Sequence, residues 1–301
     1  MVKIVVFYVA SRGQFGLYIA LKQNPLLENR PMVHDGKIVI LARGLGTRMR
    51  RQGASDLSTQ QSKIADSGVK ALVPIDRPFL DYVLSAAADA GWTNACLVIG
   101  PEHQAIRDYY GSLSYERIKV SFAVQERPLG TANAVSAVEE FADGDDFLCM
   151  NSDNYYPTSA LEDLANIEGL GLAAFESKAM VEGSNIPADR ISKFAVVQVN
   201  EDDTLVEIIE KPSNEQLASI PKPHFLSMNC WRFGPAIFPA CRAIKPSARG
   251  ELEIPDAVAH VMHQQHQPFK VIKSRSAVLD LSCRDDINAV ALRLKGTPVV
   301  L

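Results

Sequence analysis

The stretch KIVILARGLGTRMR (residues 37–50) places an apolar run directly before a turn with two glycines. An uninterrupted apolar run is typical of a strand buried on both faces of a parallel sheet. The glycines let the backbone approach a bound group, and the side chains of Thr47 and Arg48 can reach phosphate oxygens. The turn is not a dinucleotide fingerprint, because Met49 stands where G-x-G-x-x-G needs glycine, and it lacks the ending of a Walker A loop. The stretch therefore predicts an α/β fold with an anion-binding turn after an early strand.

Strands and helices alternate after this turn. We expect strands at 95–100, 119–124 and 146–151, and helices at 77–91, 101–111 (with Pro101 in its first turn) and 131–141. Later segments predict a hairpin (194–200 with 205–211), a strand (224–233) and helices at 235–243, 252–266 and 285–294. The polar stretch 52–68 predicts a mobile loop. This alternation implies a mostly parallel mixed sheet with helices on both faces, which binds ligands at the carboxyl ends of its strands.

Composition and length narrow the class of protein. The 301 residues can bury a substantial core, and we expect an N-terminal extension (1–36) followed by one large domain (37–301). A net charge of -4 without a basic stripe argues against a nucleic-acid partner. No apolar run reaches about 18 residues, so we expect no membrane span. The five cysteines form no CxxC pair, which favours a reducing, cytoplasmic location over a disulfide framework.

Three further positions carry chemical groups that suit a nucleotide. Lys70, four residues before Pro74, could neutralise a triphosphate as a point charge. Gln125 follows a strand, and its amide offers a donor and an acceptor to the edge of a pyrimidine or a guanine. Asp153 follows a buried strand, and Mg²⁺ prefers one or two carboxylates together with phosphate oxygens. Each pattern alone is common in surface turns, so only their combination indicates a function.

Taken in their order along the chain, these motifs resemble those of the sugar-1-phosphate nucleotidyltransferase family. This family includes glucose-1-phosphate thymidylyl- and uridylyltransferases and mannose-1-phosphate guanylyltransferases. The family reads LAxGxGTRL, K-x-x-x-P, Q-x-x-P-x-G-T-A and a strand ending in GD. This chain offers LARGLGTRMR, KALVP, QERPLGTA and NSDN. Downstream, IIEKP (208–212) and KPSARGELEIPD (245–256) resemble the family's EKP and PSxRGELEITD segments. The resemblance covers residues 37–286 and implies that 37–301 is the catalytic domain, with a GT-A-like architecture.

The resemblance also implies a reaction and a set of site residues. The reaction is Mg²⁺-dependent transfer of a nucleotidyl group from UTP or dTTP to a sugar 1-phosphate, with glucose 1-phosphate as the default. The expected catalytic cations are Arg48, Lys70 and Lys211. The expected nucleotide contacts are Leu41, Ala42, Gly44, Gly46, Thr47, Gln125 and Gly130. The expected sugar-phosphate contacts are Asn154, Glu210, Lys211 and Asn229. The expected metal ligands are Asp153 and Asp256.

Several departures from the family pattern keep alternatives open. Arg43 and Ser152 stand where the family has small residues, and VLDLSCRDDINAV (278–290) only loosely echoes WxDIGTPxDLxxA. A catalytically silent homologue that binds NDP-sugars is one alternative, and a guanylyltransferase is another. A glycosyltransferase of related architecture is disfavoured, because NSDN lacks a DxD metal motif. No pattern marks an oligomeric interface, and the general frequency of symmetric oligomers favours a dimer or a tetramer.

Overall fold

The computed structural model describes residues 4–11, 14–21, 34–51, 53, 56–191 and 194–301. The chain divides into two compact units, Met1–Met32 and Val33–Leu301. In the first unit, β1 (Ile4–Ser11) pairs antiparallel with β2 (Gln14–Leu21). The second unit begins slightly before the boundary expected at residue 37, because β3 spans His34–Leu41. Within the described ranges, no helix is long and apolar enough to cross a bilayer.

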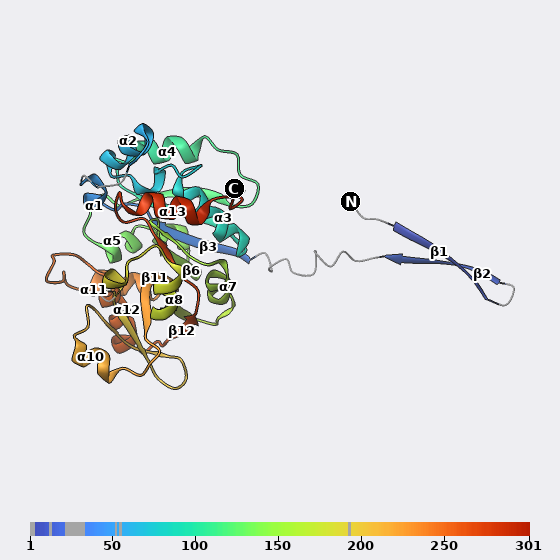
Figure 1. Cartoon of the computed structure of the whole chain (residues 1–301). Coiled ribbons are helices and arrows are strands. Elements are labelled where there is room, and N and C mark those ends of the chain that lie inside the picture. The colour runs from blue at the N-terminus through green and yellow to red at the C-terminus, as the bar shows by residue number, and fades with distance from the viewer. Residues whose placement is uncertain (1–3, 12–13, 22–33, 52, 54–55, 192–193) are drawn as a thin grey trace. The chain divides into compact units, whose positions relative to one another are not determined.

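One mixed sheet of nine strands organises the second unit (Figure 1). Its main path runs β10-β9-β11-β6-β3-β4-β5, and β8 pairs with both β11 and β12. The strands β6, β3, β4 and β5 are parallel neighbours, whereas β11 runs antiparallel to β6, β8 and β9. The bounds are β4 Trp92–Ile99, β5 Lys119–Val124, β6 Phe147–Asn151, β8 Leu170–Glu176, β9 Val196–Val199, β10 Leu205–Ile209, β11 Phe225–Phe233 and β12 Phe269–Ser274. A separate short pair joins β7 (Asn154–Tyr155) to β13 (Leu279–Asp280).

The central strands are buried on both faces because their side chains alternate between two apolar clusters. In β3, Ile38 and Ile40 belong to one cluster and Val39 belongs to the other. The first cluster also contains side chains of α3 (Phe79–Asp89), α4 (Gln104–Gly111), α7 (Thr158–Asn166) and α13 (Asp286–Leu294). The second contains those of α5 (Thr131–Ser136), α11 (Ile237–Ala243) and α12 (Ile254–Gln264). The expected α/β fold, with helices on both faces of a mostly parallel sheet, is therefore confirmed.

Three local predictions were wrong. The stretch expected to be a mobile loop contains α2 (Thr59–Ser67), which starts with a capping box between Ser58 and Gln61. The helix expected at 131–141 is split into α5 and α6 (Glu139–Ala142), because the amides of Ala137 and Val138 bond three residues back at the end of α5. Pro101 lies outside α4, whose N-cap is His103. The remaining helices are α1 (Thr47–Arg50), α8 (Ser177–Gly183), α9 (Ala188–Ile191) and α10 (Asn214–Ser219).

Candidate active site

A cavity of about 360 Å³ opens where β3, β5 and β6 end at their carboxyl termini. Its walls come from the turn after β3, from residues 68–71, from the segment after β5, from the end of β6 and from Glu251. The expected residues that line it are Leu41, Ala42, Gly44, Gly46, Thr47, Arg48, Lys70, Gln125, Gly130 and Asp153. The sheet thus brings four separate sequence motifs to one place.

The glycine turn leaves open space on the cavity side. A Cβ atom built on Gly44 would meet no atom within 4 Å, so this backbone faces room for a ligand. Gly46 has a φ of +61°, and a Cβ there would lie 2.2 Å from the carbonyl oxygen of Gly68. Glycine is therefore required at this position by both conformation and contact. The following residues, Thr47 and Arg48, are exposed and line the cavity.

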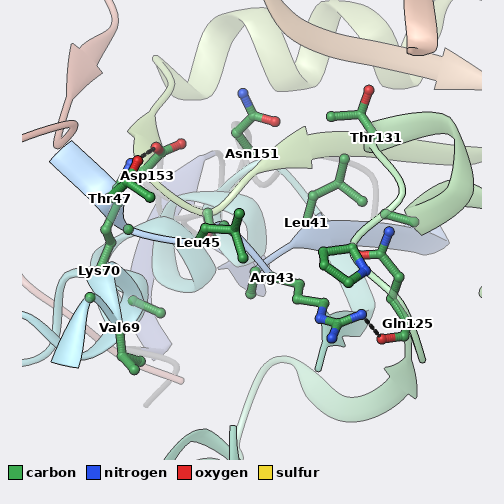
Figure 2. Close-up of a pocket in the computed structure, with 18 of the residues that line it drawn as sticks. Leu41, Arg43, Leu45, Thr47, Val69, Lys70, Gln125, Thr131, Asn151 and Asp153 are labelled. Atoms are coloured by element: carbon green, nitrogen blue, oxygen red, sulfur yellow. Dashed lines mark hydrogen bonds and ion pairs between the residues drawn. The ribbon is translucent and has the colours of Figure 1, made fainter. Parts of the chain in front are cut away.

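One end of the cavity, which we call the Lys70 end, concentrates charge. Lys70 Nζ lies 2.8 Å from Asp153 Oδ2, and both side chains are largely buried. Figure 2 shows Thr47 beside this ion pair. Among the described residues, the Arg48 guanidinium makes no hydrogen bond or ion pair. The Lys70 end thus combines a partly accessible carboxylate and a lysine, and Arg48 follows Thr47 in the turn that lines the cavity.

The opposite end, which we call the Gln125 end, holds the neutral amide of Gln125 beside Arg43, whose charge is paired with Glu102 (Figure 2). Gln125 is only 4% exposed, and its Nε2 donates to the carbonyl oxygen of Gly130 at 3.0 Å and to Asn133 Oδ1 at 2.9 Å. These two bonds occupy both amide donors. Within the described chain, no hydrogen bond reaches the amide oxygen, so Gln125 offers the cavity an acceptor.

The segment around Gly130 packs against the residues at the start of α12. Leu252 N donates to the carbonyl oxygen of Leu129 at 2.7 Å, and Ala132 N donates to that of Leu252 at 2.9 Å. The Thr131 hydroxyl accepts from Ile254 N at 3.0 Å and so satisfies one backbone amide in the first turn of α12. Glu251, in the same segment, reaches the cavity.

We expect Gly130→Ala to destabilise the fold more than Gly144→Ala. Gly130 has φ +114° and ψ 178°, a conformation almost restricted to glycine, and an added Cβ would lie 2.4 Å from the carbonyl oxygen of Leu252. Gly144 also has positive φ (+81°), but its added Cβ meets nothing within 4 Å. Urea unfolding should show a difference of about 1–3 kcal/mol, the usual cost of forcing atoms into a packed site. If both variants lost the same free energy of unfolding, the close approach of Leu252 would not restrict the residue at position 130.

Asp280 lies beside Asp153, and sequence reasoning did not select it. The pairing of β13 with β7 brings it there, and Leu281 N donates to the carbonyl oxygen of Asp153 at 2.8 Å. Burial, and then the charge of Asp153, raise the pKa of Asp280 to about 6. Its carboxylate accepts hydrogen bonds from three side chains: Asn154 Nδ2 at 3.1 Å, Ser282 Oγ at 2.9 Å and the Arg190 guanidinium.

Asp256, the expected second metal ligand, is exposed in the first turn of α12 and is not among the cavity-lining residues. Burial, followed by the charge of Glu253, raises its pKa. Asn154 is buried, and both ends of its amide are engaged by protein groups. In the described ranges, no cluster of three or more His, Cys, Asp or Glu side chains is suited to a metal ion.

The other expected sugar contacts lie outside the cavity wall. Glu210 and Lys211 are exposed directly after β10. Although burial works against it, hydrogen bonds from Ser247 and Arg249 lower the pKa of Glu253, and the charge of Lys211 adds to this shift. The segment after β10 therefore lies close to the segment that supplies Glu251. Asn229 is half-buried and has a φ of +57°. It lies in β11 where the pairing with β8 shifts register between Ser227 and Cys230.

Comparisons with known proteins agree with this architecture. A family model described as "Nucleotidyl transferase" matches residues 37–290. A glucose-1-phosphate thymidylyltransferase of Streptomyces griseus is 32% identical over 223 residues, which cover 74% of this chain and 56% of that protein. The UTP–glucose-1-phosphate uridylyltransferase AglF of Haloferax volcanii is 27% identical over 258 residues, which cover 85% of this chain and 96% of that protein.

The solved structures show the same fold. A UDP-glucose pyrophosphorylase crystallised with UDP-glucose superposes with a TM-score of 0.67 at 18% identity, covering 87% of this chain and 99% of that one. The chain spans 56–57% of the length of several curated relatives that it matches. From the family model and the thymidylyltransferase relative, the chain belongs to the nucleotidyl transferase family, in its sugar-1-phosphate nucleotidyltransferase group.

Proposed function

We propose that this protein transfers a nucleotidyl group from UTP or dTTP to glucose 1-phosphate, giving an NDP-glucose and pyrophosphate. The arrangement of the cavity carries the proposal: a buried acceptor, Gln125, lies at one end, the Lys70–Asp153 pair lies at the other, and Arg48 lines the same cavity. A nucleoside triphosphate has the same polarity, with a neutral base at one end and its charge at the other. The family relatives that act on UTP and on glucose 1-phosphate support the choice of substrates.

The acceptor of Gln125 favours a base with an N–H group at its edge. Uracil and thymine present an imide N–H, whereas cytosine presents an acceptor at the same position. Because both donors of the Gln125 amide are occupied by Gly130 and Asn133, the amide cannot simply rotate to suit cytosine. Guanine also carries an N–H at its edge, so this residue alone leaves guanylyl transfer as the second candidate.

The donor set at the Lys70 end fits magnesium. Mg²⁺ is usually held by one or two carboxylates together with phosphate oxygens and water. Asp153 would hold it from the cavity wall, and Asp280 would add a second negative charge behind Asp153. Because Asp280 lies next to Asp153, although it does not itself line the cavity, we propose it as the second carboxylate in place of Asp256. When bound, Mg²⁺ would neutralise triphosphate oxygens and make the α-phosphorus easier to attack.

The protein's own groups then mainly position and neutralise charge. An oxygen of the sugar phosphate is already anionic, so its attack on the α-phosphorus needs no general base. The new P–O bond forms as the bond to the departing pyrophosphate breaks in line. Arg48 and Lys70 would stabilise the departing charge. Glu210, Lys211 and Asn229 stay our proposed contacts for the sugar phosphate, which would enter beside the segment of Glu251.

Pyrophosphate release with Mg²⁺ tests the proposal across UTP, dTTP, CTP, GTP and ATP, each combined with a panel of sugar 1-phosphates. We expect release with UTP or dTTP and glucose 1-phosphate, and none from Asp153→Ala. Release only with GTP and mannose 1-phosphate would establish the guanylyl alternative. Binding of an NTP or an NDP-sugar without any release would establish a silent, regulatory homologue. A cytoplasmic location, where NTPs are plentiful, is part of the proposal and agrees with the five free cysteines.

A further inference from the structure

Arg43 closes the wall of the Gln125 end. Its Nε and Nη2 donate to the two carboxylate oxygens of Glu102 at 3.1 and 3.2 Å, and its Nη1 donates to the backbone carbonyl of Gln125. The Arg43 side chain is only 7% exposed, although it lines the cavity. Figure 2 shows the guanidinium turned towards Gln125 and away from the Lys70 end. Arg43 is therefore not an additional phosphate ligand.

The loop that carries Glu102 is shaped around this contact. A Cβ on Gly100 would lie 2.3 Å from both carboxylate oxygens of Glu102 and 2.4 Å from Arg43 Nε, so a larger residue there would displace the ends of these two side chains. His103 Nδ1 accepts from Gly100 N at 3.2 Å, and burial lowers the pKa of His103, which keeps the ring neutral and able to accept. Arg107 binds the carbonyl oxygens of Gly100 and Pro101 and does not line the cavity.

Gln125 is consequently held from two sides. Arg43 fixes its backbone carbonyl, while Gly130 and Asn133 fix its side-chain donors. A bidentate arginine–carboxylate pair has a defined geometry, which a flexible surface contact lacks. The backbone of Gln125 is thus held by Arg43 and Glu102 together, and its side-chain amide is held by Gly130 and Asn133.

We propose that Arg43, held by Glu102, is a positioning residue that makes the site specific for uracil or thymine over a purine. It does so by fixing the backbone of Gln125, from which the side-chain acceptor extends, and by filling space beside the base that a small residue would leave open. This inference rests on the proposed function, because it concerns which nucleotide the same cavity accepts. A purine has a second ring, and the wall formed by Arg43 limits the room for it.

The test compares Arg43→Gly, Arg43→Lys and Glu102→Gln with wild type. The control is Arg107→Ala, which removes contacts from the same loop outside the cavity. KM and kcat for pyrophosphate release are measured with UTP, dTTP and GTP, and calorimetry measures the binding of each nucleotide without sugar phosphate. Melting temperatures identify any variant that fails to fold, and the half-exposed Glu102 provides a second variant that should remain folded.

We expect Arg43→Gly to raise KM for the preferred pyrimidine triphosphate about tenfold, the scale of one misplaced hydrogen bond, with kcat changed much less. The preference for the pyrimidine over GTP should fall by about tenfold in both kcat/KM and binding. Glu102→Gln should shift both quantities in the same direction, and Arg107→Ala should leave the preference unchanged. Arg43→Lys should stay defective, because one ammonium cannot span Glu102 and Gln125.

Equal losses for all three nucleotides, full rescue by Arg43→Lys, or a wild type that binds GTP as well as UTP and dTTP would each overturn the role of Arg43. The two proposals fail separately. Absence of turnover in wild type counts against the transferase, whereas the calorimetric preference and its response to Arg43→Gly test the Arg43 contact without turnover.

Discussion

Arg48→Ala is expected to lower kcat for pyrophosphate release by about 10²–10³-fold, the usual effect of removing one preorganised donor from a developing charge. Arg48 lines the cavity and, among the described residues, has no side-chain partner that would hold it elsewhere. Its guanidinium is therefore available for the α-phosphoryl group and the departing pyrophosphate. Because this charge grows towards the transition state, KM for the nucleotide should change much less than kcat.

The matched control for this variant is Arg51→Ala. Arg51 is exposed, lies three positions further along the same segment and does not line the cavity. Steady-state kinetics at saturating nucleotide should leave this control close to wild type. If Arg48→Ala raised KM strongly and left kcat intact, Arg48 would be a ground-state contact and not a group that stabilises the transition state.

Asp153→Asn is expected to lower kcat at least about 10³-fold, because it removes the carboxylate that would hold the metal. The same change frees Lys70 from an ion pair of 2.8 Å. Nucleotide binding in the absence of Mg²⁺ should therefore become tighter than in wild type, while the gain from adding Mg²⁺ should disappear. Calorimetry with and without Mg²⁺ measures both effects, and they have opposite signs.

Asp256→Asn separates the two assignments of the second carboxylate. Asp256 is exposed on α12 and outside the cavity wall, so its loss should leave the Mg²⁺ dependence of binding and turnover near wild type. A loss comparable to that of Asp153→Asn would restore Asp256 as a metal ligand and remove Asp280 from that role.

Local patterns were sufficient for most of the fold. Apolar runs identified β3, β5, β6 and β11, and helical spacing identified α3, α12 and α13, because each of these signals lies within one short segment. The start of α2 was missed although its signal was present: Ser58 and Gln61 have the spacing of a capping box. The polar composition of that stretch outweighed the cap.

The sequence predicted the site less well where the site depends on contacts between residues that are far apart in the chain. The motifs after β3, β5 and β6 converge because carboxyl ends of parallel strands share one edge of a sheet. Asp280 meets this edge only through the two-residue strand β13, and its partner Asn154 is 126 positions away. No periodicity marks so short a strand. The contact of Arg43 with Glu102 is equally non-local, since it joins the turn after β3 to the loop after β4.

The bonds between Leu129, Ala132 and Leu252 have a consequence for how the molecule fluctuates. The backbone amides of Leu252 and Ala132 are both satisfied across the junction, so neither segment can open without exposing polar groups of the other. Their amide protons therefore share one opening equilibrium with solvent. We therefore expect the segment that follows Gln125 and the first turn of α12 to open as a single cooperative unit.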